Sequence, residues 1–241
     1  SAQLRALTSD HYGALTTAQI EALPVSQIPN LEAGDLAGLT SDQTPALSLE
    51  QVAALGTDAL QALTSEAFGA FATDQIGALT TGQVAALTST QLNNLGSSQL
   101  ESLGTAQVAA LTTSQVAALS VSQFELLSAT QLGALSTGAV VALTTEQAAA
   151  MTPDQLFGFT TSQIAAFEAD DLNALTSDVV LALSDSQVTA LTTAQVAALG
   201  PSQLATMSVL QLSVFTSGQR GAVTSDQIAA LSPEQLEALG L

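Results

Sequence analysis

An eight-residue period runs through the chain and constrains its fold more than any other feature. Counted from Leu7, the register continues without an insertion or deletion to residue 238, which gives 29 complete octads. The segment 191–198, Leu-Thr-Thr-Ala-Gln-Val-Ala-Ala, is typical of them. Self-similarity at a short fixed period indicates a stacked, quasi-one-dimensional structure in which each repeat contacts its neighbours.

Two polar positions predict that every octad begins a new helix. The second position is Ser or Thr in 21 octads and the fifth is Gln in 22. This is the spacing of a capping box, in which the hydroxyl accepts from the third helical N–H while the Gln side chain reaches back to the N–H of the cap. Pro153, Pro201 and Pro233 all occupy the third position, the first helical residue, where proline is tolerated. We therefore expect about six helical residues in each octad.

Two apolar positions predict how these helices are held together. The first position is always apolar and the sixth is mostly Val, Ile or Leu, so both are expected to be buried. Ala fills the last position in 21 octads, which permits close approach of neighbouring backbones. A helix this short is not stable alone in water, so its stability must come from packing of repeat on repeat. The sequence predicts an all-α fold, an α-solenoid of very short helices with one helix per octad.

Two other folds could accommodate an eight-residue repeat. A single continuous helix would rotate its Leu positions by about 80° per octad and spread them over every face. A β-solenoid would need alternating, β-branched residues, whereas Ala and Gln dominate fixed positions here. Both are less consistent with the pattern than the α-solenoid. The number of octads per superhelical turn is not evident from the sequence.

The domain organisation follows from the uninterrupted register. Residues 1–241 are expected to form a single elongated repeat domain. Its start, 1–46, is irregular, because Pro24, Pro29 and Pro45 fall at a cap or late in their octads, where distorted helices are expected. The chain begins and ends inside a repeat, and we expect a segment of a longer array or a filament protomer whose ends join other copies.

Composition excludes several classes of function. The chain has 21 acidic residues against two Arg and no Lys, a net charge of −19. Nucleic acids and anionic membrane surfaces need clustered Lys and Arg, so neither is an expected partner. No apolar run approaches the length of a membrane span, so no membrane insertion is expected. The absence of cysteine rules out disulfides and thiolate chemistry.

Few residues are of the types that catalysis or metal binding requires. The one cluster of catalytic types is Asp10, His11 and Tyr12, where His11 replaces the capping Gln and Tyr12 the apolar residue after it. We therefore expect no enzyme activity and no cofactor. Glu168, Asp170 and Asp171 place three carboxylates within four residues, a weak candidate for Ca²⁺, which prefers oxygen ligands. These carboxylates also serve as cap substitutes.

Two features leave alternatives open, and a third departs from the repeat. Residues 151–182 hold the bulkiest group, Met151, Phe157, Phe159 and Phe167, which indicates either a locally wider core or an aromatic docking patch. Arg220 stands at a usually apolar sixth position with Phe215 nearby. The recurrent Gln either caps its own helix or forms a ladder of amides that hydrogen-bond between successive repeats.

The pattern Leu-Thr-x-x-Gln-Val-x-x-Leu, seen for example at 191–199, resembles long octapeptide arrays in very large exported proteins of proteobacteria that are labelled adhesins or haem-utilisation exoproteins. The resemblance implies an extracellular or cell-surface location and a structural role. The expected function is therefore an extracellular stalk, fibre, surface layer or adhesin spacer that self-associates end to end. The alternative is a protein-binding solenoid whose acidic surface imitates DNA. Rows of Thr that bind ice or carbohydrate are a third, weaker hypothesis.

Overall fold

The computed structural model describes residues 8–241, and each octad in that range carries one short helix. Most of the helices have five or six residues, and no strand occurs among the described residues. This confirms the prediction of an all-α solenoid with one helix per octad. The short helices and the absence of strands among residues 8–241 exclude both the continuous helix and the β-solenoid.

The chain divides into two compact units, Ser1–Leu119 and Ser120–Leu241. The expectation of one elongated domain over 1–241 stays a prediction. Unit 1 contains α1 (Ser9–Gly13), α2 (Thr17–Glu21), the 3₁₀ helix η2 (Val25–Asn30), α3 (Ala33–Leu36), the 3₁₀ helix η3 (Thr44–Ala46), α4 (Leu49–Ala54), α5 (Thr57–Ala62), α6 (Ser65–Gly69), α7 (Thr73–Gly77), α8 (Thr81–Ala86), α9 (Ser89–Asn93), α10 (Ser97–Glu101), α11 (Thr105–Ala109) and α12 (Thr113–Ala118).

Unit 2 repeats the same arrangement. It contains α13 (Val121–Glu125), α14 (Ala129–Ala134), α15 (Thr137–Val141), α16 (Thr145–Ala149), α17 (Pro153–Phe157), α18 (Thr161–Ile164), α19 (Ala169–Ala174), α20 (Ser177–Leu181), α21 (Asp185–Ala190), α22 (Thr193–Ala198), α23 (Pro201–Thr206), α24 (Val209–Ser213), α25 (Ser217–Gly221), α26 (Ser225–Ala230) and α27 (Pro233–Leu239).

The helices begin where the capping pattern predicts and end at the next octad. Thr112 has an extended backbone and precedes α12, and its hydroxyl accepts a hydrogen bond from the backbone N–H of Gln115 at 3.2 Å. At the other end Leu119 is extended again, with ψ of 132°, and donates its N–H to the carbonyl of Val116 at 3.2 Å. Two consecutive extended residues, the first and second positions of an octad, thus form the corner between one helix and the next.

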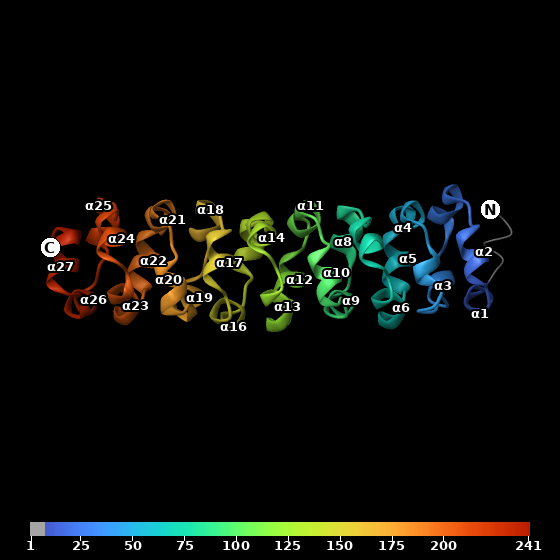
Figure 1. The fold of residues 1–241 in the computed structure, drawn as a ribbon, viewed down its shortest axis with the longest axis horizontal. Helices are drawn as coiled ribbons and strands as arrows, with labels where there is room; N and C mark the ends of the chain where they lie inside the picture. The colour runs from blue at the N-terminus through green and yellow to red at the C-terminus, as the bar shows by residue number, and fades with distance from the viewer. Residues whose placement is uncertain (1–7) are drawn as a thin grey trace. The chain divides into compact units, whose positions relative to one another are not determined.

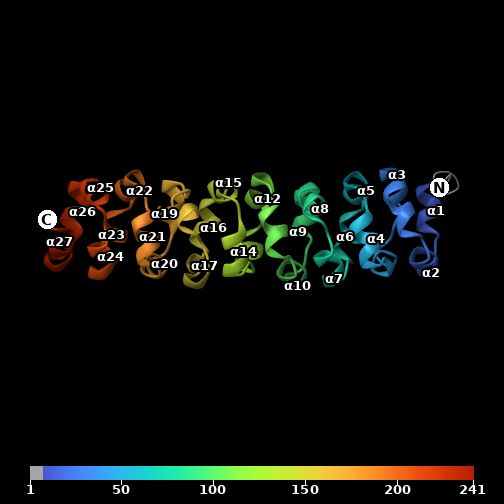
Figure 2. The ribbon, with the colours of Figure 1, turned by 90° about the horizontal axis from the view of Figure 1, so that it is seen from above.

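Within each unit a helix packs on the helix three octads away. In unit 1, α4 contacts α7 and α5 contacts α8; in unit 2, α17 contacts α20 and α23 contacts α26. Both views of the ribbon show the chain of each unit climbing in successive turns (Figure 1, Figure 2). Because packing partners are 24 residues apart and hydrogen-bonded partners up to 31, one turn takes between three and four octads. The structure supplies this number, which the sequence left open.

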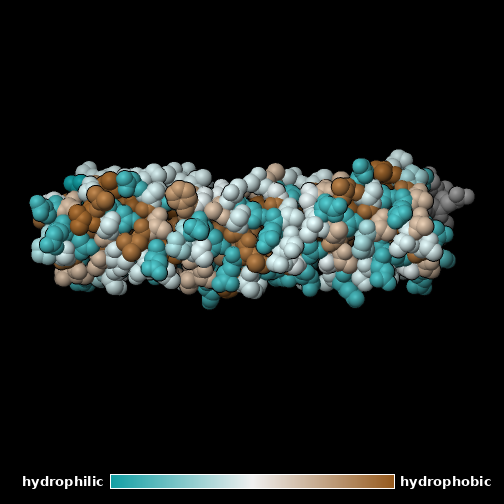
Figure 3. All heavy atoms as spheres, viewed as in Figure 1, coloured by the Kyte–Doolittle hydropathy of each residue, from teal (hydrophilic) through white to brown (hydrophobic). Residues whose placement is uncertain are grey.

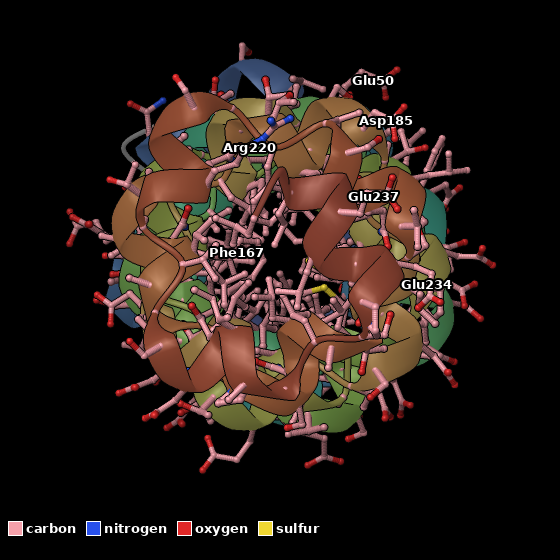
Figure 4. The ribbon with its side chains drawn as sticks, turned by 90° about the vertical axis from the view of Figure 1, so that its left-hand side faces the viewer. Glu50, Phe167, Asp185, Arg220, Glu234 and Glu237 are labelled. Atoms are coloured by element: carbon pink, nitrogen blue, oxygen red, sulfur yellow. The ribbon has the colours of Figure 1, made fainter. Side chains whose placement is uncertain are left out.

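The core of each unit is built from the first and sixth positions. Val116 and Leu119 show the pattern in unit 1, with 0% and 4% of their surfaces exposed. Burial of one such side chain contributes roughly 1.5–3 kcal/mol, which is how helices too short to be stable alone persist when stacked. In unit 2, seen from its α27 end, Phe167 lies in the interior, whereas Asp185 and Glu234 lie at the outer edge (Figure 4).

Two octads depart from the α-helical repeat in the part of residues 1–46 that the structure describes. Two octads in this stretch form 3₁₀ helices in place of α-helices, η2 with Pro29 inside it and η3 with Pro45 near its start. Proline lacks the N–H that a longer α-helix would use, so the i→i+3 pattern of a 3₁₀ turn is the available local structure. Residues 1–7, including Arg5, lie outside the described residues.

Candidate functional site

The glutamine side chain at the fifth position uses both ends of its amide. In unit 1, Oε1 of Gln115 accepts from the backbone N–H of Thr112 at 2.8 Å, as a capping box requires. Its Nε2 donates to the backbone carbonyls of Val84 at 2.8 Å and Leu87 at 2.7 Å, which are 31 and 28 residues earlier. Gln115 is 3% exposed, so this buried amide is satisfied by donors and acceptors of the protein itself. The capping and ladder roles, posed as alternatives, therefore coexist in one side chain.

The carbonyls that accept these bonds are the ones a helix cannot satisfy alone. The last four C=O groups of any α-helix lack intrahelical partners, and in helices of five or six residues this is most of the helix. Each amide therefore joins the N-terminus of one helix to the C-terminal end of a helix one superhelical turn earlier. We call this arrangement the glutamine ladder. Amides that donate to such carbonyls within one unit are those of Gln43, Gln51, Gln75, Gln83, Gln91, Gln99, Gln107, Gln115, Gln155, Gln163, Gln187, Gln195, Gln203, Gln211, Gln219, Gln227 and Gln235.

Capping survives where the hydroxyl is lost. Gly96 and Gly104 replace the usual Ser or Thr, yet their backbone N–H groups still donate to Oε1 of Gln99 and Gln107, each at 2.8 Å. Glycine is a tolerated cap residue because the cap geometry depends on the backbone. The Gln is therefore the half of the capping box that the fold keeps when the hydroxyl is absent.

The three carboxylates singled out as a calcium candidate are used in other ways. Glu168 is the N-cap of α19 and is exposed, as is Asp170. Asp171 takes the place of the ladder Gln, is 4% exposed, and its Oδ1 accepts from the hydroxyl of Thr145 at 3.2 Å. Over residues 8–241 the structure gathers no group of three or more Asp, Glu or His side chains suited to a metal ion. The geometry thus adds nothing to the calcium hypothesis.

Asp171 nevertheless has a perturbed pKa. Burial raises the pKa of Asp171, the hydrogen bond from Thr145 lowers it in part, and the nearby carboxylates of Glu168 and Asp170 raise it further. Only 4% of the surface of Asp171 is exposed, which agrees with loss of hydration as the main cause of its raised pKa. A buried carboxylate therefore stands where the repeat otherwise places a neutral donor.

The cluster of catalytic residue types at the start of unit 1 has a structural role. Nδ1 of His11 accepts from the backbone N–H of Thr8 at 3.0 Å, as the capping Gln would. Tyr12 points the other way and is fully buried, and burial followed by the Asp35 carboxylate raises the pKa of Tyr12 to about 12. Asp10 and His11 are exposed. The structure does not bring the three side chains together, and His11 substitutes for Gln as predicted.

The bulky group of residues 151–182 is divided by the structure. Met151, Phe159 and Phe167 are each 3% exposed, and the rings of Phe159 and Phe167 meet edge to face with centroids 5.2 Å apart. These three form the wider core that was one of the two alternatives. Phe157 is 71% exposed and does not belong to that core.

Arg220 also acts on backbone carbonyls. Its Nε donates to the carbonyl of Phe215 at 3.0 Å and its Nη2 to that of Ser213 at 3.1 Å. These are carbonyls at the C-terminal end of α24, the same kind of group that the ladder amides bind elsewhere. The Arg side chain thus supplies donors of the ladder type from a sixth position, which is usually apolar.

The outer surface is polar and acidic. Glu50 and Glu234 stand near the starts of their helices, and hydrogen bonds from their own backbone N–H groups and from Ser48 and Ser232 hold the pKa of each carboxyl below its usual value. Open grooves in unit 1 lie between cap segments three octads apart, for example beside Glu32 and Asp58. Within residues 8–241, no helix is long or apolar enough to cross a membrane.

Comparison with known proteins agrees with the repeat geometry. The model of the ALTTAQ repeat family matches six segments, 1–33, 28–65, 59–89, 84–121, 126–161 and 164–201, which leaves little of the chain unmatched. The chain belongs to the ALTTAQ repeat family. Each match spans about four octads, close to the reach of one ladder amide. No curated protein matches the ALTTAQ array described here.

Sequence reasoning missed two features of this ALTTAQ array. The partners of the ladder amides are backbone carbonyls, which carry no residue identity and so leave no sequence signal. The exposed Leu181 did have a signal, because it and Phe157, which the sequence analysis singles out, both occupy the seventh position and are 24 residues apart, the spacing of packed helices.

Proposed function

We propose that the chain is a structural module of an exported bacterial surface protein, a spacer in a stalk, fibre, surface layer or adhesin. The observation that carries this proposal is the glutamine ladder, which couples every turn of a unit to the turn before it through buried hydrogen bonds. A spacer needs stiffness that extends with the number of repeats, and nearest-neighbour stacking supplies it. With only two Arg and no Lys, the chain offers trypsin-like proteases few cleavage sites, which favours an extracellular location.

The spacer role is tested by changing the number of octads inside one unit. Deletion of residues 79–110 removes four whole octads of unit 1 and keeps the register of those that remain. We expect the helical circular dichroism per residue to be unchanged and the maximum dimension in small-angle scattering to fall in proportion to the octads removed. Loss of helicity, or a dimension that does not change, would count against a spacer. Matched deletion of 79–107, which breaks the register, is the control and is expected to lose helicity.

Location and self-association need separate measurements. Labelling of intact cells with an antibody against the repeat is expected to stain the surface, and staining only after permeabilisation would contradict the proposal. Sedimentation at increasing concentration tests end-to-end association, which is expected to yield chains of copies. A single monomeric species at all concentrations would restrict the proposal to a spacer within one polypeptide.

A second candidate, a protein-binding solenoid, is favoured by the charge of the surface. Carboxylates such as Asp185 and Glu234 lie at the outer edge of unit 2 (Figure 4). Such a surface attracts basic proteins, and their capture should weaken steeply as salt rises. Binding that is insensitive to salt would argue against an acidic, DNA-like surface.

A further inference from the structure

Among the exposed large apolar side chains of unit 2, four lie on helices that adjoin one another, although the core positions of their octads are filled. They are Phe157 of α17, Leu181 of α20, and Val209 and Leu210 of α24, with exposed fractions of 71%, 47%, 45% and 76%. Hydropathy mapped on the surface shows apolar side chains interrupting the polar face over the helices toward the C-terminal end of unit 2 (Figure 3). We call these four residues the apolar strip.

The strip follows helices that are neighbours along unit 2. Phe157 and Leu181 occupy equivalent positions of α17 and α20, which pack directly on each other. The ladder connects the start of α24 to the end of α20, because Nε2 of Gln211, the neighbour of Leu210, donates to the carbonyl of Leu181 at 3.2 Å. The helix segments that carry these exposed apolar side chains therefore adjoin one another.

The backbone beneath the strip is tightly packed. Gly158 follows Phe157, and a Cβ added to Gly158 would lie 2.1 Å from the carbonyl oxygen of Ala129, which belongs to α14. The backbone around Leu181 is held by the glutamine ladder, since the carbonyls of Val180 and Leu183 also accept from Gln211. Apolar side chains on such a backbone form a preorganised surface, which loses little conformational freedom when it is covered.

The rim of the strip is acidic. Asp154 precedes Phe157 by three residues and Asp178 precedes Leu181 by three, so each carboxylate adjoins its apolar residue on one helix face. Both Asp side chains are exposed. The one basic residue of unit 2, Arg220, is engaged with backbone carbonyls. The charge that complements this rim is positive.

We propose that the apolar strip docks a basic amphipathic helix of another protein. The apolar residues of such a helix recur at i, i+3, i+4 and i+7 along one line and would cover the strip, while its Lys and Arg would pair with Asp154 and Asp178. A second copy of this chain is disfavoured as the occupant of the strip because the strip of that copy carries the same carboxylates, Asp154 and Asp178, which would repel their counterparts. This inference does not depend on the spacer role.

The test uses the full chain and a synthetic peptide of about five helical turns built from Lys and Leu in amphipathic order. A peptide of the same composition in scrambled order has equal charge and serves as the probe control. We expect the amphipathic peptide to bind more tightly than the scrambled one at physiological salt. The variant Phe157→Ser/Leu181→Ser/Leu210→Ser should lose at least about tenfold in affinity for the amphipathic peptide, because apolar anchors dominate such interfaces.

A matched variant separates the strip from general surface effects. Val141→Ser changes another seventh-position residue, 44% exposed on α15 and outside the strip, and should bind the peptide as the parent chain does. Circular dichroism verifies that both variants keep their helices. Equal binding of the two peptides, or undiminished binding by the triple variant, would overturn the proposal. Dimerisation that the triple variant abolishes would also overturn the proposal, in favour of a second copy of the chain. Flotation with zwitterionic vesicles that the triple variant abolishes would overturn it in favour of a lipid surface.

Discussion

Substitution of one ladder glutamine by glutamate would test the hydrogen-bond arrangement that organises the fold. Gln115→Glu keeps the shape of the side chain and keeps an oxygen for the N–H of Thr112. It replaces the Nε2 donor with a second oxygen, aimed at the carbonyls of Val84 and Leu87 at distances of 2.8 and 2.7 Å. Two attractive contacts thereby become repulsive ones in a site that excludes water.

The expected loss follows from what each carbonyl retains. The Val84 carbonyl still accepts from the N–H of Leu87 at 3.1 Å, whereas the Leu87 carbonyl keeps no other hydrogen-bond donor among the described residues. An unsatisfied buried polar group costs about 1–3 kcal/mol and a buried charge without a donor adds to it, so we expect a loss of roughly 2–5 kcal/mol at neutral pH. This is larger than the effect of a typical point mutation, about 1 kcal/mol.

The loss should depend on pH with a definite sign. The folded state favours the protonated acid at position 115, which can donate again, so the pKa of the introduced carboxyl is raised above its unfolded value of about 4.3. The deficit relative to the parent chain is therefore small below pH 4 and grows as pH rises through the folded-state pKa. A deficit that grew on acidification would contradict the ladder.

Hydrogen exchange measured by mass spectrometry is the appropriate assay, because long repeat arrays lose two-state cooperativity. Peptides covering 80–87 and 112–119 should exchange faster in Gln115→Glu. The matched control is Gln19→Glu, since the Oε1 of Gln19 caps Thr16 at 2.9 Å while its Nε2 donates to no carbonyl among residues 8–241. The control should change by no more than about 0.5 kcal/mol. If both variants behaved alike, the ladder would not be a stabilising element.

Three further substitutions test other contacts. Gly158→Ala should destabilise unit 2 by at least about 1 kcal/mol in urea unfolding, because the new Cβ meets the Ala129 carbonyl. A Cβ at Gly82 has open space, so Gly82→Ala should stabilise its helix by roughly 0.5–1 kcal/mol. Equal effects of the two substitutions would refute this packing. Asp171→Gln should stabilise α19 above neutral pH. Because the pKa of Asp171 is raised in the folded state, the carboxyl contributes to stability below its unfolded pKa, and this contribution is lost as pH rises. Faster hydrogen exchange of residues 169–174 on acidification of the parent chain would contradict this. Arg220→Ala should increase exchange at the end of α24 by leaving two carbonyls without donors, and unchanged exchange would show that these bonds are not stabilising.

Much of the local structure could be predicted from the octad because the signals are local. Thr112 and Gln115 are three residues apart, and the geometry of the helix start joins them whatever the tertiary structure. Prolines likewise act within their own turn, and η2 around Pro29 is distorted as expected. The helix starts and the irregular stretch were therefore accessible to reasoning about a few neighbouring residues.

The reach of the amides was not accessible in the same way. The choice between capping and a ladder treated the Gln amide as one group, although its oxygen and its nitrogen face opposite directions. The nitrogen of Gln115 binds Val84 and Leu87 through carbonyls that any residue would provide. The distance of 28 to 31 residues follows from the pitch of the superhelix, which depends on packing and not on any single residue.

The exposure of Phe157 was only partly predictable from the sequence, for a different reason. Grouping Phe157 with Phe159 and Phe167 by size left open whether the group forms a wider core or a docking patch, whereas the octad position separates Phe157 from the other two. Phe159 and Phe167 are at first positions, which the fold buries throughout; Phe157 is at a seventh position, whose occupants vary in polarity. The register was thus the better guide to burial than residue volume.

The backward reach of the glutamine ladder has a consequence for how such genes change length. Loss or duplication of one whole octad moves every later amide onto carbonyls equivalent to those it had before. A change that is not a multiple of eight residues misaligns the donors of each octad within reach of the altered site, because partners lie 28 and 31 residues upstream. Copy number is therefore free to vary by unequal recombination, whereas frame within the octad is not, and an array of 29 units with no irregular spacing is the expected outcome.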